Sequence, residues 1–285
     1  MQKVLLKIKY LLSLLFYSCG ICAVINYFIK LFYGNQPPLI VLCYHSVDED
    51  MMCQFEKQID YLIRQNYKII SGIELLKLLY YPVEPDNNSK YICLTFDDCY
   101  EDNYFIVRNI LVKKKIPAIF FAPSCKLGQY VDWNSCYAHK RLMTVEQLKD
   151  MSRSFDIGSH TRNHIKLAEA SSDVYVDEIK NSKNDLEKIL DREVVFFAYP
   201  HGSYNRKVIQ YLSECKFKSA FTVRQHVNYS YKEKYELGRY LIKPDNFRDF
   251  KLKVSGGYDW FFFLNKFLFH NICRIASFEK NKQQP

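Results

Sequence analysis

The sequence of 285 residues predicts an α/β protein, a distorted (β/α) barrel of seven or so parallel strands preceded by one transmembrane helix. Three observations support this prediction. Short apolar runs alternate with segments of helical period beyond residue 38. Several of these runs, such as VVFFAY at 194–199, are apolar almost throughout, which is typical of parallel strands covered on both faces. A stretch of twenty residues near the N-terminus contains no charge.

That uncharged stretch, residues 10–29, is the first predicted element. As a helix it would span roughly the 30 Å hydrocarbon core of a bilayer. Three lysines precede it, and the positive-inside tendency places them in the cytoplasm. We therefore expect residues 1–33 to anchor the chain in the cell membrane with a single pass, so that the following domain is periplasmic or extracellular. A cleaved signal peptide and a buried core helix are the alternatives.

The remaining elements follow from the alternation of strand-like and helix-like segments. Strands are expected at 39–45, 91–96, 118–122, 155–159, 194–199, 219–223 and 238–242. Helices are expected at 52–66, 72–80, 102–115, 145–153, 173–190 and 204–214. Thr144 and Gln147 have the spacing of a capping box at the start of one of these helices. Residues 34–255 are expected to form one domain with a barrel or a doubly wound sheet.

The C-terminal segment, residues 256–285, is expected to form an amphipathic helix and a tail. Residues 260–275 read WFFFLNKFLFHNICRI, which gives one very apolar side at helical spacing. This side could pack on the barrel or lie on a membrane surface.

Composition and motifs exclude several classes of function. The chain is 48% hydrophobic and 25% charged, which excludes disorder. The net charge is +9, and the four lysines of residues 1–33 leave a dispersed +5 for the remainder, so nucleic acid is not an expected partner. No G-x-G-x-x-G or Walker sequence occurs, so no nucleotide cofactor is expected.

Polar residues follow the predicted strands where each strand ends. The run YICLTF leads into Asp97 and Asp98, and a turn at that point could bring both carboxylates to one centre. Two carboxylates at such a short separation need a cation nearby or a shared proton. A helix cap would account for one carboxylate but not for both.

A second strand, at 155–159, leads into His160 and His164, whose spacing of four presents both rings to one side. With Asp98 they make a set of two histidines and one carboxylate that leaves open positions on a metal ion. The alternative is a pair of hydrogen-bonded loop histidines. A third strand leads into the turn at 200–205, whose N–H groups could hold an oxyanion. The first strand ends at His45.

Three of these sequences, TFDDC, HTRNH and YPHG, together resemble the motifs of the NodB-homology polysaccharide deacetylases of carbohydrate esterase family 4, which read TFDDG, H-[ST]-x-x-H and R-P-x-Y-G. The resemblance covers roughly residues 38–250. The sequence YHSV at 44–47 is most similar to the poly-N-acetylglucosamine deacetylase subgroup, in which the motif order is circularly permuted and the acid histidine comes first.

The resemblance implies a role for each of these residues. Asp97 would be the general base and His45 the general acid. One divalent metal ion, zinc or otherwise nickel, cobalt or iron, would be held by Asp98, His160 and His164. The backbone N–H of His201 would bind the oxyanion.

Three departures from the family pattern are visible. Cys99 replaces the glycine of the first motif, which restricts the turn. Ala198 stands where the third motif has the arginine that orients the base, and Arg239 is the expected substitute. No later L-x-H motif appears within residues 34–255, and His226 is the alternative acid.

The resemblance implies a metal-dependent hydrolase that removes N-acetyl groups from amino sugars of an exported polysaccharide or oligosaccharide. Three rival functions stay open at this point. The first is a deacylase or deformylase of a sugar on a lipid carrier, the second is an inactive carbohydrate-binding relative, and the third is a non-haem iron oxygenase.

Overall fold

The computed structural model describes residues 2–22, 24–25, 37–81 and 90–261. The chain divides into two compact units, residues 36–247 and residues 1–35 with 248–285. The larger unit contains the strands of the described part and the predicted site residues. The predicted domain limits, 1–33, 34–255 and 256–285, stay predictions, and most of the last range lies outside the described residues.

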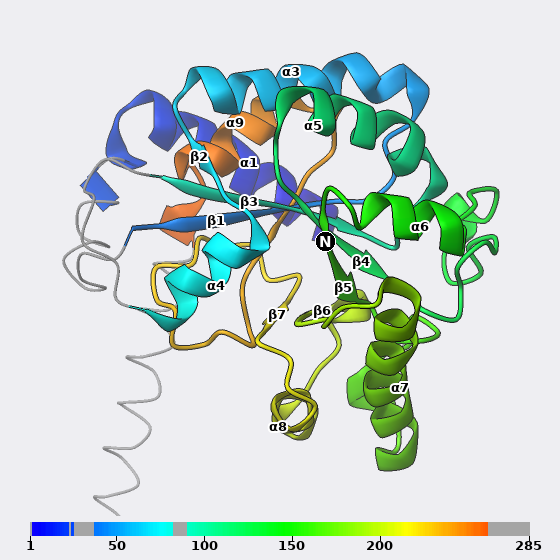
Figure 1. Cartoon of the computed structure of the whole chain (residues 1–285). Helices are drawn as coiled ribbons and strands as arrows, with labels where there is room; N and C mark the ends of the chain where they lie inside the picture. Colours follow the sequence, from blue (N-terminus) through cyan, green and yellow to red (C-terminus); the bar gives the residue numbers. More distant parts are fainter. Residues whose placement is uncertain (1, 23, 26–36, 82–89, 262–285) are drawn as a thin grey trace, which may run out of the picture. The chain divides into compact units, whose positions relative to one another are not determined.

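The larger unit is built on parallel strands, of which Figure 1 labels β1 to β7. All seven predicted strands are present. In chain order they are β1 (Leu39–Tyr44), β3 (Tyr91–Asp97), β4 (Ile119–Ala122), β5 (Asp156–Ser159), β6 (Phe196–Ala198), β7 (Ser219–Phe221) and β8 (Tyr240–Leu241). Their order in space is β7-β6-β5-β4-β3-β1-β8. A further strand, β2 (Lys68–Ile69), pairs with β3 and was not predicted.

The segment around β8 connects the two ends of this strand path. On one side β8 pairs with β1, where Leu42 is opposite Tyr240. On the other side Leu237 forms a bridge with Phe221 of β7, and the Thr222 N–H donates to the Leu237 carbonyl at 2.8 Å. The strands therefore form a distorted half-barrel whose two ends are joined through this segment, in agreement with the parallel α/β part of the predicted fold class.

Helices lie around the strands at the predicted positions (Figure 1). They are α3 (Met52–Arg64), α4 (Gly72–Tyr80), α5 (Arg108–Lys114), α6 (Val145–Met151), α7 (Ser172–Leu190) and α8 (Arg206–Glu214). Single 3-10 turns occupy Glu49–Met51, Ser135–Tyr137, Leu167–Glu169 and Pro200–Gly202, and a π-helical turn at Asn103–Val107 precedes α5. The predicted capping box of Thr144 and Gln147 is present at the start of α6.

Side chains alternate between two apolar layers along the strands. Val41, Cys93 and Phe121 belong to an inner cluster, which Leu75 and Leu78 of α4 close at one end. The intervening residues form an outer layer of stacked rings in which Phe96 lies between Tyr44 and Phe120. Cys43 comes two residues after Val41 and is opposite Thr95. The alternation therefore places Cys43, Thr95 and Asp97 on the inner face.

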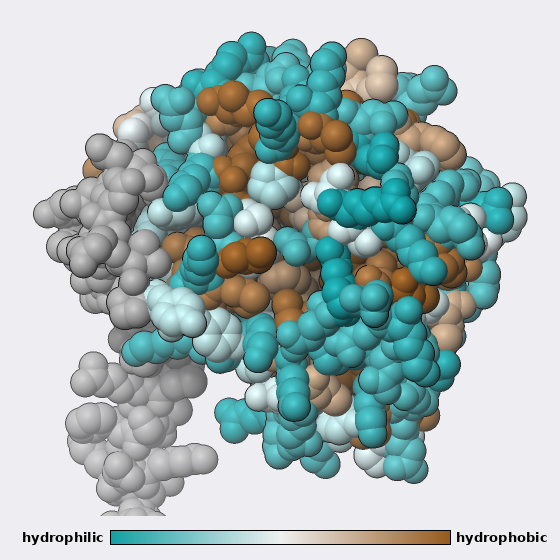
Figure 2. Space-filling view, in the orientation of Figure 1, coloured by the Kyte–Doolittle hydropathy of each residue, from teal (hydrophilic) through white to brown (hydrophobic). Residues whose placement is uncertain are grey.

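The outer surface of the view shown in Figure 2 is mostly hydrophilic, with separate apolar patches rather than one continuous area. Exposed apolar side chains among the described residues include Ile73 of α4 and Val112 of α5. Such scattered residues are ordinary on a folded domain and do not by themselves indicate a docking surface.

The smaller unit contains α1 (Gln2–Ser18) and all of α9 (Phe247–Ser255) except its first residue. The indole N–H of Trp260 donates to Ser13 Oγ at 2.9 Å, and its ring contacts Phe16 edge-on at 5.1 Å. No helix in the described part of the chain combines the length and the apolar character of a membrane span. The predicted transmembrane helix is therefore not supported, and part of its range, residues 23 and 26–29, lies outside the described residues.

Candidate active site at the carboxyl ends of the strands

Most of the predicted site residues lie at the carboxyl ends of the barrel strands. His45 follows β1, Asp97 is the last residue of β3 and Asp98 follows it. His160 follows β5, the turn with His201 follows β6, and Arg239 directly precedes β8. Parallel strands deliver their C-terminal residues to the same end of a barrel, so residues far apart in the sequence become neighbours there.

Several of these residues have an unusual backbone conformation. Nine non-glycine residues of the described part have a positive φ, and five of them lie in this site: Asp98, Cys99, Thr161, His164 and His201. A left-handed conformation costs a non-glycine residue roughly 1–3 kcal/mol and is retained only where the surroundings enforce it. Cys99, at φ 53°, therefore occupies a position that the glycine of the family motif would occupy without strain.

The first group of side chains consists of Asp98, His160 and His164, all of them buried. The Oδ1 atom of Asp98 lies 3.5 Å from His160 Nε2 and 3.2 Å from His164 Nε2. The possible ligand atoms of the three residues lie within 4.8 Å of one another. The structure therefore brings the predicted ligand set together.

The protonation of His160 determines what this group can hold. Its Nδ1 lies 2.8 Å from the Ala198 carbonyl oxygen, which can only accept, so Nδ1 carries the proton. Burial lowers the pKa of His160 to about 4 although Asp97 opposes the shift, so the ring is neutral at neutral pH. Its Nε2 lone pair then faces the carboxylate oxygen of Asp98.

A cation between two acceptors that face each other across 3.5 Å would remove their repulsion. Among the described residues, Asp98 Oδ1 is buried and has no hydrogen-bond partner. Burying an unpaired acceptor is costly, and a divalent ion would remove that cost. The donor set, neutral imidazole with carboxylate, suits zinc and related ions, so the residues present fit the metal.

The second group centres on Asp97. Arg239, whose side chain is 1% exposed, binds both carboxylate oxygens: Nη1 lies 2.6 Å from Oδ1 and Nη2 lies 2.7 Å from Oδ2. Burial alone would raise the pKa of Asp97, but the Arg239 guanidinium, assisted by His160 and His45, holds it well below its usual range. Asp97 is therefore ionised throughout the neutral pH range.

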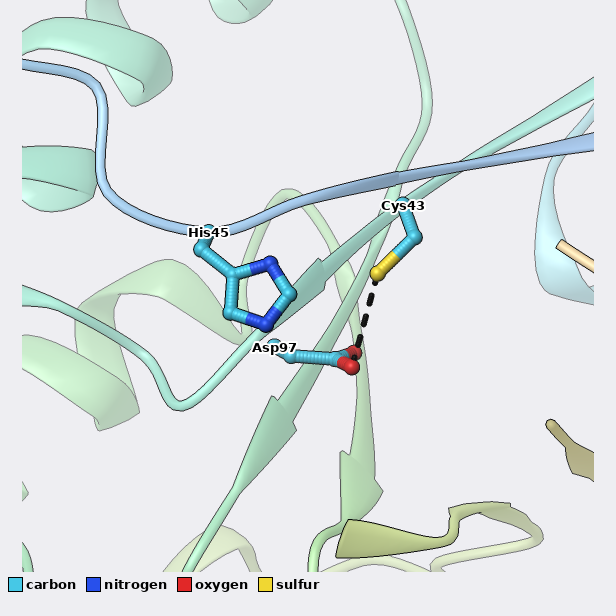
Figure 3. Close-up of side chains that lie close together, drawn as sticks. All are labelled: Cys43, His45 and Asp97. Atoms are coloured by element: carbon cyan, nitrogen blue, oxygen red, sulfur yellow. Dashed lines mark hydrogen bonds between the residues drawn. The ribbon is translucent and has the colours of Figure 1, made fainter. Parts of the chain in front are cut away.

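Cys43 and His45 lie beside the same carboxylate (Figure 3). The Cys43 thiol donates to Asp97 Oδ2 across 3.5 Å, and the His45 ring points toward Asp97. The three residues could also surround a cation. However, the guanidinium already neutralises the carboxylate, and burial raises the pKa of the Cys43 thiol well above its usual range. A metal at this point would need the thiolate, so the first group is the better candidate.

The loop after β1 is held by residues that follow β3. The Asn103 side-chain amide donates to the His45 carbonyl at 3.0 Å. Asp102 accepts from Ser46 Oγ at 2.5 Å and from the Val47 N–H at 3.2 Å. The segment that follows the two carboxylates thus also positions the half-buried His45.

The remaining predicted residues have less defined surroundings. The turn at Pro200–Gly202 is closed by the Gly202 N–H, which donates to the Tyr199 carbonyl at 2.9 Å. The His201 ring contacts the His164 ring at 4.7 Å, and the oxyanion role of its N–H stays a prediction. His226 lies between β7 and β8, and its Nδ1 is 3.0 Å from the Val227 carbonyl.

Two contacts of the site were not predicted from the sequence. One is the Cys43 thiol on Asp97, and the other is the Trp133 ring, which stacks on the His164 ring at 4.1 Å and 23°. The position of Cys43 could have been predicted, because the alternation of side chains along the strand places it on the inner face. There it is opposite Thr95, two residues before Asp97. Trp133 lies in an irregular loop, where the sequence has no period to interpret.

The arrangement of these residues is typical of a hydrolase built on an α/β barrel, because an ionised acid, a facing histidine and a set of possible metal ligands share one edge of the barrel. The family model described as polysaccharide deacetylase matches residues 84–220. Residues 84–220 therefore carry a polysaccharide deacetylase domain, and the members of that domain family are hydrolases acting on carbon–nitrogen bonds.

Individual relatives agree with this assignment. The poly-beta-1,6-N-acetyl-D-glucosamine N-deacetylase of Staphylococcus aureus is 25% identical over 204 residues, which are 68% of each chain. The structure of IcaB from Ammonifex degensii superposes with a TM-score of 0.68 at 24% identity, over 78% of this chain and 97% of that one. The Streptococcus pyogenes deacetylase PplD, solved with acetate, gives a TM-score of 0.63 at 24% identity, over 76% and 97%. The two structural similarities concern the fold.

Proposed function

We propose that this protein is a metal-dependent N-deacetylase that removes acetyl groups from amino sugars of an exported polysaccharide. The observation that carries the proposal is the unpaired Asp98 Oδ1, which faces the neutral Nε2 of His160 close to an ionised Asp97. The substrate class is taken from the name of the Staphylococcus aureus relative. The proposed metal is zinc, with nickel, cobalt or iron as alternatives.

The chain's own residues supply the proton transfers of amide hydrolysis. Asp97, kept ionised by Arg239, would accept the proton of the attacking water. His45, on the same side of the site, would deliver a proton to the leaving amine. The N–H of His201 would donate to the oxyanion, a contribution of roughly 3–4 kcal/mol in other enzymes. When bound, a divalent cation supplies Lewis-acid polarisation of the carbonyl and lowers the pKa of water.

We further propose that the catalytic domain works at the cell membrane on its periplasmic or extracellular side. The support comes from sequence: residues 10–29 carry no charge and follow three lysines. Cell fractionation, with protease added to intact cells, tests this location. A chain found in the cytoplasmic fraction and protected from protease contradicts it.

The activity is tested by measuring acetate release from poly-β-1,6-N-acetylglucosamine. We expect a chelator to abolish release and added Zn²⁺ to restore it. Asp97→Asn removes the base and should lower kcat roughly 10²–10⁴-fold while metal binding persists. Asp173→Asn, an acid in the first turn of α7, is the matched control and should keep full activity. Acetate release that is insensitive to both chelator and Asp97→Asn would refute the mechanism.

A further inference from the structure

The loop that joins the two proposed histidine ligands is held in a strained conformation. Thr161 and His164 have φ values of 64° and 59°, in the left-handed region. The His164 N–H donates to Thr161 Oγ1 at 2.9 Å, which fixes the turn locally. A loop of this shape needs partners outside itself, because its buried main-chain groups would otherwise lose their hydrogen bonds.

The carbonyl groups of the loop obtain their partners from the segment after β4. The Ser124 N–H donates to the Thr161 carbonyl at 3.1 Å, and the Cys125 N–H donates to the Arg162 carbonyl at 3.0 Å. These bonds hold one side of the loop and leave the N–H groups of its other side to be satisfied by a different element.

That element is α7, through the single side chain of Glu178. Its Oε2 accepts from the Arg162 N–H at 2.8 Å and from the Asn163 N–H at 2.9 Å. Its Oε1 accepts from the Asn163 side-chain amide at 2.6 Å. Glu178 is 4% exposed, so this carboxylate is shielded from water, and both of its oxygens accept hydrogen bonds from the loop.

The neighbouring acids of α7 make a different kind of contact. Asp177 and Asp185 bind the Arg162 guanidinium at 3.0 and 3.2 Å, and they are considerably more exposed than Glu178. Exposed pairs of this type contribute little. Asp177 carries the same charge one residue away without binding the loop's main chain, and therefore offers a matched comparison for Glu178.

We infer that Glu178 is a positioning residue that sets the affinity of the site for its metal. By fixing both N–H groups between His160 and His164, it holds the two rings at the separation that lets both face Asp98. Residues that orient metal ligands in this way commonly change metal affinity by about 10–100-fold when removed. The inference rests on the metal site of the proposed function.

The test measures the dissociation constant of Zn²⁺ by competition with a fluorescent chelator. Glu178→Ala is expected to weaken Zn²⁺ binding by about 10–100-fold. Glu178→Gln should restore most of the affinity, because its amide oxygen can still accept from both N–H groups. Asp177→Asn should bind as the wild type does. At saturating Zn²⁺ the kcat of Glu178→Ala should approach the wild-type value, so the loss appears in the Zn²⁺ concentration that gives half-maximal activity.

A stability control separates positioning from general destabilisation. Ile179→Ala removes a buried side chain from the same helix without removing a hydrogen bond to the loop, and should lower the thermal midpoint but leave Zn²⁺ affinity unchanged. If Glu178→Ala does not fold, Glu178→Asp is used, because its shorter carboxylate withdraws from the loop while the charge stays on α7; weakened binding is again expected.

The possible failures differ from one another. If the wild type binds Zn²⁺, and His160→Ala abolishes this binding, but the Glu178 variants bind equally well, the positioning role is refuted and the proposed function stands. If the wild type itself shows no saturable Zn²⁺ binding, the metal site and this inference both fall.

Discussion

The ion pair of Asp97 and Arg239 yields the sharpest prediction for stability. Arg239→Met keeps most of the side-chain volume but removes the guanidinium that binds both carboxylate oxygens. Asp97, 3% exposed, would then be a buried charge without its partner. Breaking a buried pair from one side typically costs about 3–5 kcal/mol. We therefore expect the free energy of unfolding to fall by about 3–5 kcal/mol near neutral pH.

The pH dependence of this loss has a definite sign. In the wild type the Asp97 pKa lies below its unfolded value, so the pair stabilises the fold above that value and loses this contribution as the pH falls. In Arg239→Met, burial raises the Asp97 pKa, so the folded state binds a proton more readily than the unfolded chain and is penalised as the pH rises. Both effects make the difference in the free energy of unfolding between variant and wild type smaller at acidic pH.

Urea unfolding of both proteins at about pH 7 and about pH 4.5 measures these differences. The double variant Arg239→Met with Asp97→Asn should recover part of the loss, because no isolated charge stays buried. The acidic limb of the kcat/KM profile for acetate release should move to higher pH in Arg239→Met. A loss below about 1 kcal/mol, equal at both pH values, would refute the view that Arg239 keeps Asp97 ionised.

Two further predictions concern Cys99 and His160. Cys99→Gly should fold, with a free energy of unfolding within about 1–2 kcal/mol of the wild type, because relief of the positive φ offsets the lost side chain. Cys99→Val should lose more stability, because a β-branched residue tolerates that φ poorly. Thermal midpoints of the two variants test this, and equal midpoints contradict it. In the metal-free protein, the free energy of unfolding should decline by up to ~3 kcal/mol as the pH falls from about 6.5 to about 4. The reason is that the histidine of the unfolded chain binds a proton in this range, whereas the buried His160 of the folded protein does not. Urea titrations across this range measure the decline, and His160→Gln should flatten it.

Most of the architecture could be predicted because the predicted strands lie within apolar runs bounded by polar residues. The strand that was missed, β2, lies in no such run, and its exposed Lys68 gives no apolar alternation to detect. The π-helical turn at Asn103–Val107 looks like ordinary helix in the sequence, because its apolar spacing differs little from that of α5.

The site was predictable to the extent that its residues follow strands directly. Asp97, Asp98 and His160 occur at the ends of apolar runs, where the barrel brings them together. The contacts of Glu178 could not be found in this way. It lies on the amphipathic helix α7, where a single acid resembles its solvent-exposed neighbour Asp177, and only the folded structure shows which of the two faces the loop.

The strict alternation of inner and outer side chains limits how this chain can change in length. Deleting one residue within β3 would turn Asp97 outward into the layer of stacked rings and move Phe96 inward to the place of Thr95. An insertion beyond the strand ends would leave that phase intact, because a loop absorbs added residues at small entropic cost. Descendants of this gene can therefore lengthen their surface loops freely, while the strands before the reacting groups must keep their residue count.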